Sequence, residues 1–99
     1  MSKTLDRKEI EKKLPTKSFV RNEQSHHIYF NHYYDGKKTG IYTYISHSPK
    51  IKTYSGALLK SMQKQLRLDS LDEVVNLVKC PLTLEQYNNI LREKGILNP

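Results

Sequence analysis

The chain holds four histidines, and all of them lie in its central part: His26, His27, His32 and His47. Because the ordinary pKa of an imidazole is about 6.5, a histidine can both accept and donate a proton near neutral pH. Cleavage of RNA needs little more than this. A base removes the proton of a ribose 2′-hydroxyl, the oxygen attacks the adjacent phosphorus, and an acid protonates the leaving 5′-oxygen, while nearby lysines stabilise the developing charge. The histidines are therefore candidates for acid–base catalysis on RNA without a metal or another cofactor.

A metal site is the alternative use of clustered histidines, and the spacing argues against it. His26 and His27 are adjacent, so on a strand they point to opposite faces. His26 and His32 share a face but lie about 20 Å apart at roughly 3.3 Å per residue. The chain also lacks the cluster of carboxylates that magnesium prefers. We therefore expect no metal, and for His26 and His32 a structural role is favoured over a chemical one.

The residues around the histidines predict the strands that would position them. Residues 25–34 are rich in aromatic side chains and run into the turn signal Asp35-Gly36. Residues 41–46 alternate between apolar and polar with period two, which also predicts a strand. Alternation then divides the side chains between a core face and an open face. The core face should hold Ile28, Phe30, Ile41, Thr43 and Ile45, and the open face His27, Tyr29, Asn31, Tyr33, Tyr42 and Tyr44.

Turn and capping signals predict the elements around this pair of strands. Asp6 should cap a helix that runs to about residue 13, followed by a strand at 17–21 and a turn at 22–24. Residues 35–40 should form a loop. Ser55 should cap a helix whose inward side chains are Leu58, Leu59, Met62 and Leu66. Capping boxes at Ser70 and Thr83 predict two short helices that end before Pro81 and Gly95, with Leu71, Val74, Val75 and Val78 and then Leu84, Tyr87, Ile90 and Leu91 inward.

These elements predict a single α+β domain over residues 1–99. A three-stranded antiparallel meander should have helices on one face only, in the order α-β-β-β-α, with two further short helices at the C-terminus. The open face then carries His27 and the tyrosines. Cross-strand neighbours on one face lie close together, so the tyrosines should form a group.

Composition favours a polyanionic partner. The 99 residues include 17 lysines and arginines against 10 acidic residues, a net charge of +7, which favours nucleic acid. Lys50 and Lys52 follow the strands in a basic loop, and Lys60 and Lys64 lie on one face of the next helix, where they could contact phosphates. No apolar run is long enough to span a bilayer, no signal-peptide pattern is present, and Cys80 is the only cysteine. We therefore expect a cytoplasmic protein without membrane contact, with Cys80 as a small buried side chain.

Three stretches resemble the HicA-type toxins. His27-Ile28-Tyr29-Phe30 matches that family's H-x-x-[FY] strand motif, and His47 lies where its second histidine follows the third strand. Residues 55–66 resemble its closing helix, which typically reads G-[TS]-L-x-x-[IM]-x-[KR]-Q-x-[GN]-L. The resemblance covers about residues 6–68. The C-terminal helical extension, residues 69–99, lies outside the minimal toxin and resembles that of longer archaeal HicA-like proteins.

The resemblance implies a fold like that of double-stranded-RNA-binding domains and a metal-independent endoribonuclease, an mRNA interferase. It also implies a HicB-like antitoxin as a protein partner. His27 takes the catalytic position, His47 the second, and His26 is the neighbour that a shift of one residue in the alignment would select instead. The residues that would bind RNA are Tyr29, Tyr42, Tyr44, Lys50, Lys52, Lys60 and Lys64.

Two other functions fit the same residues. A non-catalytic RNA-binding module could stack bases on the tyrosines and hold phosphates with the lysines. An interaction module could instead dock a protein partner on the tyrosines or on the C-terminal helices. The three functions differ in whether RNA is cleaved, bound only, or ignored.

Overall fold

The computed structural model describes residues 3–47, 50–79 and 81–97. Its central element is a three-stranded antiparallel sheet in the order β2-β3-β4, formed by Phe19–Glu23, His27–Tyr34 and Lys37–Ser46. The register pairs Ile28 with Ile45 and Phe30 with Thr43. All four of these side chains are buried. The predicted meander and its core face are therefore confirmed, and the fold class is α+β.

The hairpin between β3 and β4 is tighter than the predicted loop at residues 35–40. Asp35 and Gly36 have φ angles of 53° and 76°. Positive φ at both central residues defines the two-residue turn that matches the twist of paired strands, so β4 already begins at Lys37. Asn31 pairs with Tyr42, but Tyr33 pairs with Lys38, so β4 has more residues than β3 between these two pairs. The ladder is irregular there, and Gly40 has a φ of 87°. The polar composition of residues 37–40 had concealed their strand conformation.

The turn between β2 and β3 also lies later in the chain than predicted. β2 continues to Glu23 and the ladder closes where the Gln24 amide donates to the His27 carbonyl, at 2.8 Å. The turn is therefore Ser25-His26, and the prediction of a turn at residues 22–24 was wrong. His26 consequently lies in the turn, outside the strand that was expected to begin at Ser25.

A second, two-stranded sheet was not predicted. β1 (Thr4–Asp6) and β5 (Thr53–Ser55) pair in antiparallel fashion, with Leu5 opposite Tyr54 and both side chains buried. Ser55 is therefore a strand residue, and Gly56 occupies the N-cap of the following helix α2 (Ala57–Gln65). Three-residue strands are too short for alternation to reveal them, and their partners are remote in sequence.

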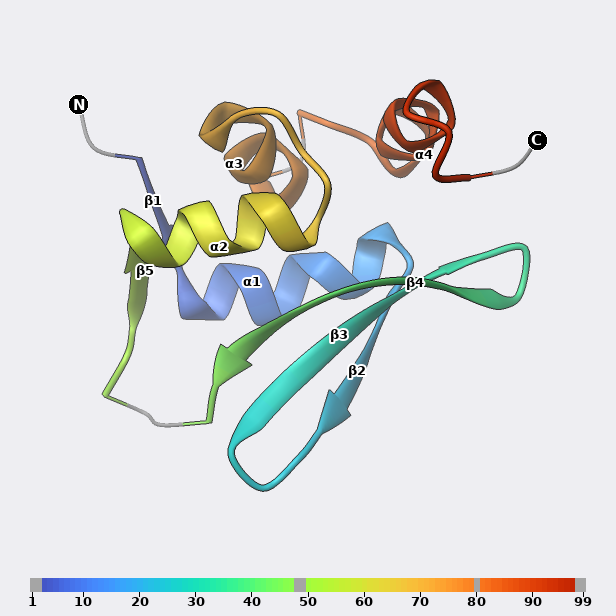
Figure 1. Cartoon of the computed structure of the whole chain (residues 1–99). Coiled ribbons are helices and arrows are strands. Elements are labelled where there is room, and N and C mark those ends of the chain that lie inside the picture. Colours follow the sequence, from blue (N-terminus) through green and yellow to red (C-terminus); the bar gives the residue numbers. More distant parts are fainter. Residues whose placement is uncertain (1–2, 48–49, 80, 98–99) are drawn as a thin grey trace.

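The helices lie on one side of the three-stranded sheet, as Figure 1 shows. α1 (Arg7–Lys13) begins at the predicted capping box of Asp6 and leads into a short 3₁₀ segment, η1 (Leu14–Lys17). On α2, Leu59, Met62 and Leu66 are buried, but Leu58 is 44% exposed. Its predicted inward position was wrong, because the three buried residues already fill the one stripe that can face the core.

The two C-terminal helices belong to the same core. α3 (Leu71–Lys79) buries Val74, Leu77 and Val78, while Leu71 and Val75 are only partly buried. α4 (Leu84–Glu93) begins at the predicted capping box of Thr83, buries Tyr87 and Leu91, and leaves Leu84 and Ile90 partly exposed. Cys80 lies outside the described residues. The predicted boundary at residue 68, between the HicA-like part and the C-terminal extension, does not separate two cores, because the helices on either side of it share one core.

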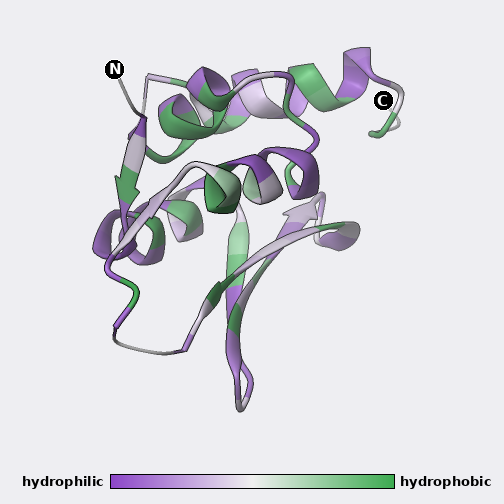
Figure 2. Cartoon of the chain, turned by 60° about the vertical axis from the view of Figure 1, so that its left-hand side comes forward, coloured by the Kyte–Doolittle hydropathy of each residue, from purple (hydrophilic) through white to green (hydrophobic). Residues whose placement is uncertain are grey.

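No helix among the described residues lies on the far side of the sheet (Figure 1). In Figure 2 the β2–β3 hairpin reaches beyond the helices, and its far end is largely hydrophilic. Within the described ranges, no helix combines the length and the apolar character needed to cross a membrane.

Candidate functional site

The uncovered side of the sheet carries a group of aromatic side chains, which we call the tyrosine face: His27, Tyr29, Tyr42 and Tyr44. Tyr29 lies directly opposite Tyr44 in the β3–β4 register, and their ring centroids are 5.5 Å apart. Tyr42 lies 6.0 Å from Tyr29 and 6.5 Å from Tyr44, nearly parallel to the latter. Tyr42 and Tyr44 are 46% and 37% exposed. Flat, exposed rings at this spacing offer stacking surfaces for planar ligands.

His27 lies at the edge of the tyrosine face, where β3 begins. Its ring packs edge-on against Tyr44, with 4.9 Å between centroids, and lies 6.0 Å from Tyr29. Its side chain is partly buried and keeps some exposure to solvent. The residue opposite it is Ser46, whose amide donates to the Tyr54 hydroxyl at 3.0 Å. Tyr54 is buried in β5 and thereby holds the end of β4 beside His27.

His26 and His47 lie close to His27 in the backbone but outside the group of ring contacts that defines the tyrosine face. The His47 amide donates to the His26 carbonyl at 3.1 Å, which places the two residues opposite each other just beyond the paired strands. Both are exposed. Both residues lie outside the paired strands, and the ring contacts with Tyr29 and Tyr44 are made by His27. The structure therefore gathers three histidines at one end of the sheet, with only His27 among the tyrosines.

His32 has the structural role that the sequence favoured. Its side chain is fully buried and packs against Phe19, at 5.0 Å between centroids, and Tyr87, at 5.3 Å. Nε2 lies 3.1 Å from the Asn88 Oδ1 and Nδ1 lies 3.0 Å from the Thr39 hydroxyl. Burial lowers the pKa of His32, although the hydrogen bond to Asn88 opposes this. The neutral imidazole therefore joins α4 to β4.

The predicted phosphate-binding lysines are distributed over several surfaces. Lys64 lines a hollow beside Tyr42, together with Gly40, Gln65 and Arg67. Lys60 is exposed on α2, and Lys50 is exposed in the loop before β5. Lys38 was not among the predicted residues, yet it lines a second hollow on the tyrosine face with Tyr29, Asn31 and Tyr42. The strong turn signal Asp35-Gly36 could have revealed it, because a two-residue turn places Lys38 opposite Tyr33.

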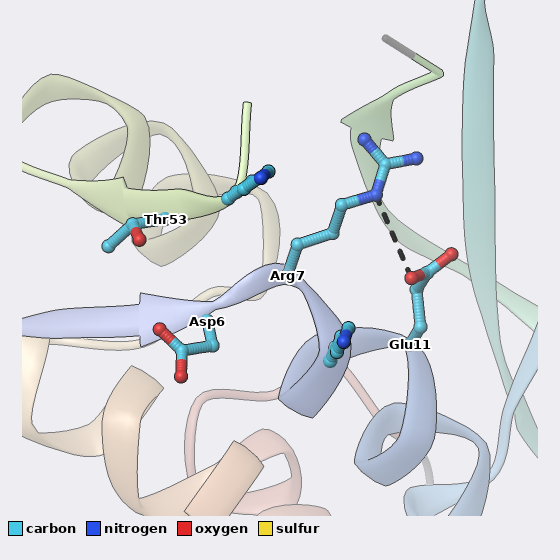
Figure 3. Close-up of a pocket in the computed structure, with 6 residues that line it drawn as sticks. Asp6, Arg7, Glu11 and Thr53 are labelled. Atoms are coloured by element: carbon cyan, nitrogen blue, oxygen red, sulfur yellow. Dashed lines mark ion pairs between the residues drawn. The ribbon is translucent and has the colours of Figure 1, made fainter. Parts of the chain in front are cut away.

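Lys52 lies apart from the tyrosines, in a hollow of about 430 Å³ at the start of α1. Figure 3 shows Asp6, Arg7, Glu11 and Thr53 around this space. Arg7 pairs with Glu11 at 3.7 Å, and Arg21 approaches the same carboxylate at 3.4 Å. Volumes of this size accommodate small ligands, but such pockets are mostly apolar. Here two carboxylates, Asp6 and Glu11, offset most of the charge of the three lining cations, Arg7, Lys8 and Lys52, which weakens any preference for an anion.

Comparisons with known proteins do not identify the chain. No protein-family model, curated protein or solved structure matches it. Within the part of the chain that the structure describes, no group of three or more histidine, cysteine, aspartate or glutamate side chains could hold a metal ion. The tyrosine face and its single histidine are thus the features on which a functional proposal must rest.

Proposed function

We propose that this protein is a HicA-like endoribonuclease that binds RNA on the tyrosine face and cleaves it with His27 as general acid and base. The observation that carries the proposal is the position of His27: it is the one histidine that borders a group of exposed aromatic rings on an uncovered sheet. The three-stranded sheet β2-β3-β4 between α1 and α2, with the short β5 before α2, supports the proposal that the fold is like that of double-stranded-RNA-binding domains, as the family resemblance implies.

The chemistry follows from stacking and proton transfer. Bases that stack on Tyr29 and Tyr44 bring the adjoining ribose and phosphate toward His27, which contacts both rings. The neutral imidazole takes the proton of the 2′-hydroxyl, and this oxygen attacks the neighbouring phosphorus. The bond to the 5′-oxygen breaks and that oxygen receives the proton back from the imidazolium. The products are a 2′,3′-cyclic phosphate and a free 5′-hydroxyl. A HicB-like antitoxin would neutralise the enzyme by covering the tyrosine face.

A non-catalytic RNA-binding module is the second candidate. The observation that favours it is the separation of His26 and His47 from the tyrosine face, which leaves His27 without a second histidine as a partner. The tyrosines alone suffice for binding, since stacking of each base contributes about 1–3 kcal/mol.

Incubation of RNA with purified protein in a buffer containing EDTA distinguishes the two candidates. The wild type should cleave, and His27→Ala should lower the rate at least about 100-fold, the usual contribution of a general acid or base. His26→Ala is the matched control, because it removes the adjacent histidine, which lies off the tyrosine face, and it should cleave like the wild type. Circular dichroism should show that all three proteins are folded.

Each other outcome has a definite reading. Binding of RNA without cleavage by the wild type would refute the ribonuclease proposal and select the binding module. Loss of cleavage with His26→Ala and retention with His27→Ala would show that the wrong face has been assigned. Absence of both binding and cleavage would refute both candidates and leave a protein-interaction module.

A further inference from the structure

We infer that a single RNA strand leaves the tyrosine face over the edge of β4 at Gly40, and that Lys64 and Arg67 bind its phosphates on the far side of that edge. This inference rests on the proposed binding of RNA to the tyrosine face and adds the path of the strand and two phosphate contacts. It requires binding only, so it holds whether or not the RNA is cleaved.

Tyr42 connects the two surfaces. It borders the hollow on the tyrosine face that Lys38 lines, and it also borders the hollow that contains Gly40, Lys64 and Arg67. The second hollow lies between β4 and the end of α2, where the buried Thr43 hydroxyl donates to Gln65 at 2.6 Å and fixes the helix to the strand. A strand whose base stacks on Tyr42 therefore has cations on both sides of it.

The charge of the second hollow favours phosphate. Its lining residues include two cations, Lys64 and Arg67, and no carboxylate. The hollow at the start of α1 differs in this respect, because Asp6 and Glu11 oppose its cations. Gly40 contributes no side chain at the edge and has nothing within 4 Å of the position that a Cβ would occupy. Gly40 therefore places no side chain in the second hollow, which leaves room there for a sugar–phosphate backbone.

The backbone of Arg67 determines where its side chain lies. Arg67 follows the C-cap of α2 and has a φ of 62°, while the Leu68 amide donates to the Gln63 carbonyl at 3.0 Å. This is the left-handed ending of a helix that glycine ordinarily occupies, because a Cβ is unfavourable there. Ser18 and Asp35 also have positive φ, so this conformation sets the position of the Arg67 side chain and does not by itself assign it a function. Here the side chain brings a guanidinium, which suits phosphate, to the hollow beside Tyr42.

Salt dependence of binding tests the inference directly. The probe is a fluorescein-labelled oligouridine of about 12 nucleotides with 2′-O-methyl groups, which prevent cleavage while leaving bases and phosphates intact. Its Kd is measured by fluorescence anisotropy between about 0.05 and 0.3 M KCl. For single strands, each phosphate contact contributes about 0.7 to the slope of log Kd against log salt, or roughly a fourfold change in Kd near 0.15 M.

Lys64→Gln and Arg67→Gly should each raise Kd roughly fourfold and reduce the slope by about 0.7, and the double variant should reduce it by about 1.4. Arg67→Lys keeps the charge and should keep the slope, which separates charge from backbone effects. Lys12→Gln, an exposed lysine of α1 on the covered side of the sheet, is the matched control and should bind like the wild type. Arg67→Gly should also unfold at a higher temperature, because it relieves the left-handed strain.

The results separate the inference from the proposed function. In one outcome, the wild type binds the probe, Tyr44→Ala weakens that binding, and Lys64→Gln and Arg67→Gly keep the wild-type slope of log Kd against log salt. This outcome would refute the path over β4 and leave the proposed binding of RNA to the tyrosine face intact. If the wild type does not bind the probe, RNA binding itself is refuted together with the path. Equal losses with Lys12→Gln and Lys64→Gln would show a diffuse electrostatic attraction and would also overturn the path.

Discussion

Stability should fall as the pH is lowered through the range in which an exposed histidine takes up a proton, and His32 should account for much of the loss. Its imidazole is fully buried between Phe19 and Tyr87. With its proton on Nε2, the neutral ring donates to Asn88, and Nδ1 lies 3.0 Å from the Thr39 hydroxyl, which donates to the His32 carbonyl. The other titratable group in contact with the ring is Tyr87, and burial raises its pKa, so it remains neutral as well. No charge therefore stabilises an imidazolium at this place.

The sign and size of the effect follow from proton linkage. Burial lowers the pKa of His32 in the native state below its ordinary value of 6.5, so just below pH 6.5 the unfolded chain binds more protons than the native protein. The stabilisation is complete above pH 6.5 and is lost as the pH falls toward the native pKa. Between about pH 7.5 and 5.5 the free energy of unfolding should drop by at most about 1.4 kcal/mol, the value for a native ring that takes up no proton.

Urea unfolding of the wild type and of His32→Gln at the two pH values measures this difference. Glutamine can still donate to Asn88 but does not titrate, so the variant should lose up to about 1.4 kcal/mol less than the wild type on acidification. His26→Gln replaces an exposed histidine in the β2–β3 turn and should keep the wild-type loss. Identical pH dependence in the wild type and His32→Gln would refute the reasoning, because the common contributions of all other groups cancel in the comparison.

Two further changes test the fold itself. Lys17 is 6% exposed, and its ammonium donates to the carbonyls of Leu77, at the end of α3, and Leu82. Lys17→Met should lower the free energy of unfolding by about 1–3 kcal/mol because these two acceptors lose their donor. An unchanged urea midpoint would contradict this prediction. Gly36→Ala should cost about 1–2 kcal/mol because the β3–β4 turn holds this residue at positive φ, whereas a thermal midpoint equal to that of the wild type would show that the turn can adopt another form.

Much of the candidate site could be predicted because it depends on local alternation. Along β3 and β4 every second side chain points the same way. The aromatic residues at positions 29, 42 and 44 therefore had to share a face with His27 once the two strands paired at a turn beginning with Asp35-Gly36. The same alternation placed Ile28, Phe30 and Ile45 in the core, as the structure confirms. Capping boxes at Asp6 and Thr83 likewise concern groups three residues apart, and both are present.

Apart from the two misplaced hairpin turns, the errors in the predictions concern how remote parts of the chain pack together. Ser55 is of a residue type that often caps helices, but it pairs with Thr4 and is therefore part of β5. Leu58 fitted the apolar stripe of α2, but the core is filled by its neighbours. Arg67 continues the basic stripe of Lys60 and Lys64, which favoured phosphate contact, but the sequence did not place it beside the tyrosines. Its place beside Gly40 follows from the irregularity in β4 and from the docking of α2 on that strand.

The sequence by itself determined which residues face which way along each strand, and so determined the tyrosine face and the place of His27 on it. Only the tertiary structure decided that His32 is joined to Asn88, that Lys17 is buried against α3, and that Lys64 and Arg67 border Tyr42. The physical reason is that strand alternation and helix capping are short-range properties of the backbone. Contacts between remote residues depend instead on how the whole chain lowers its free energy by burying its apolar surface.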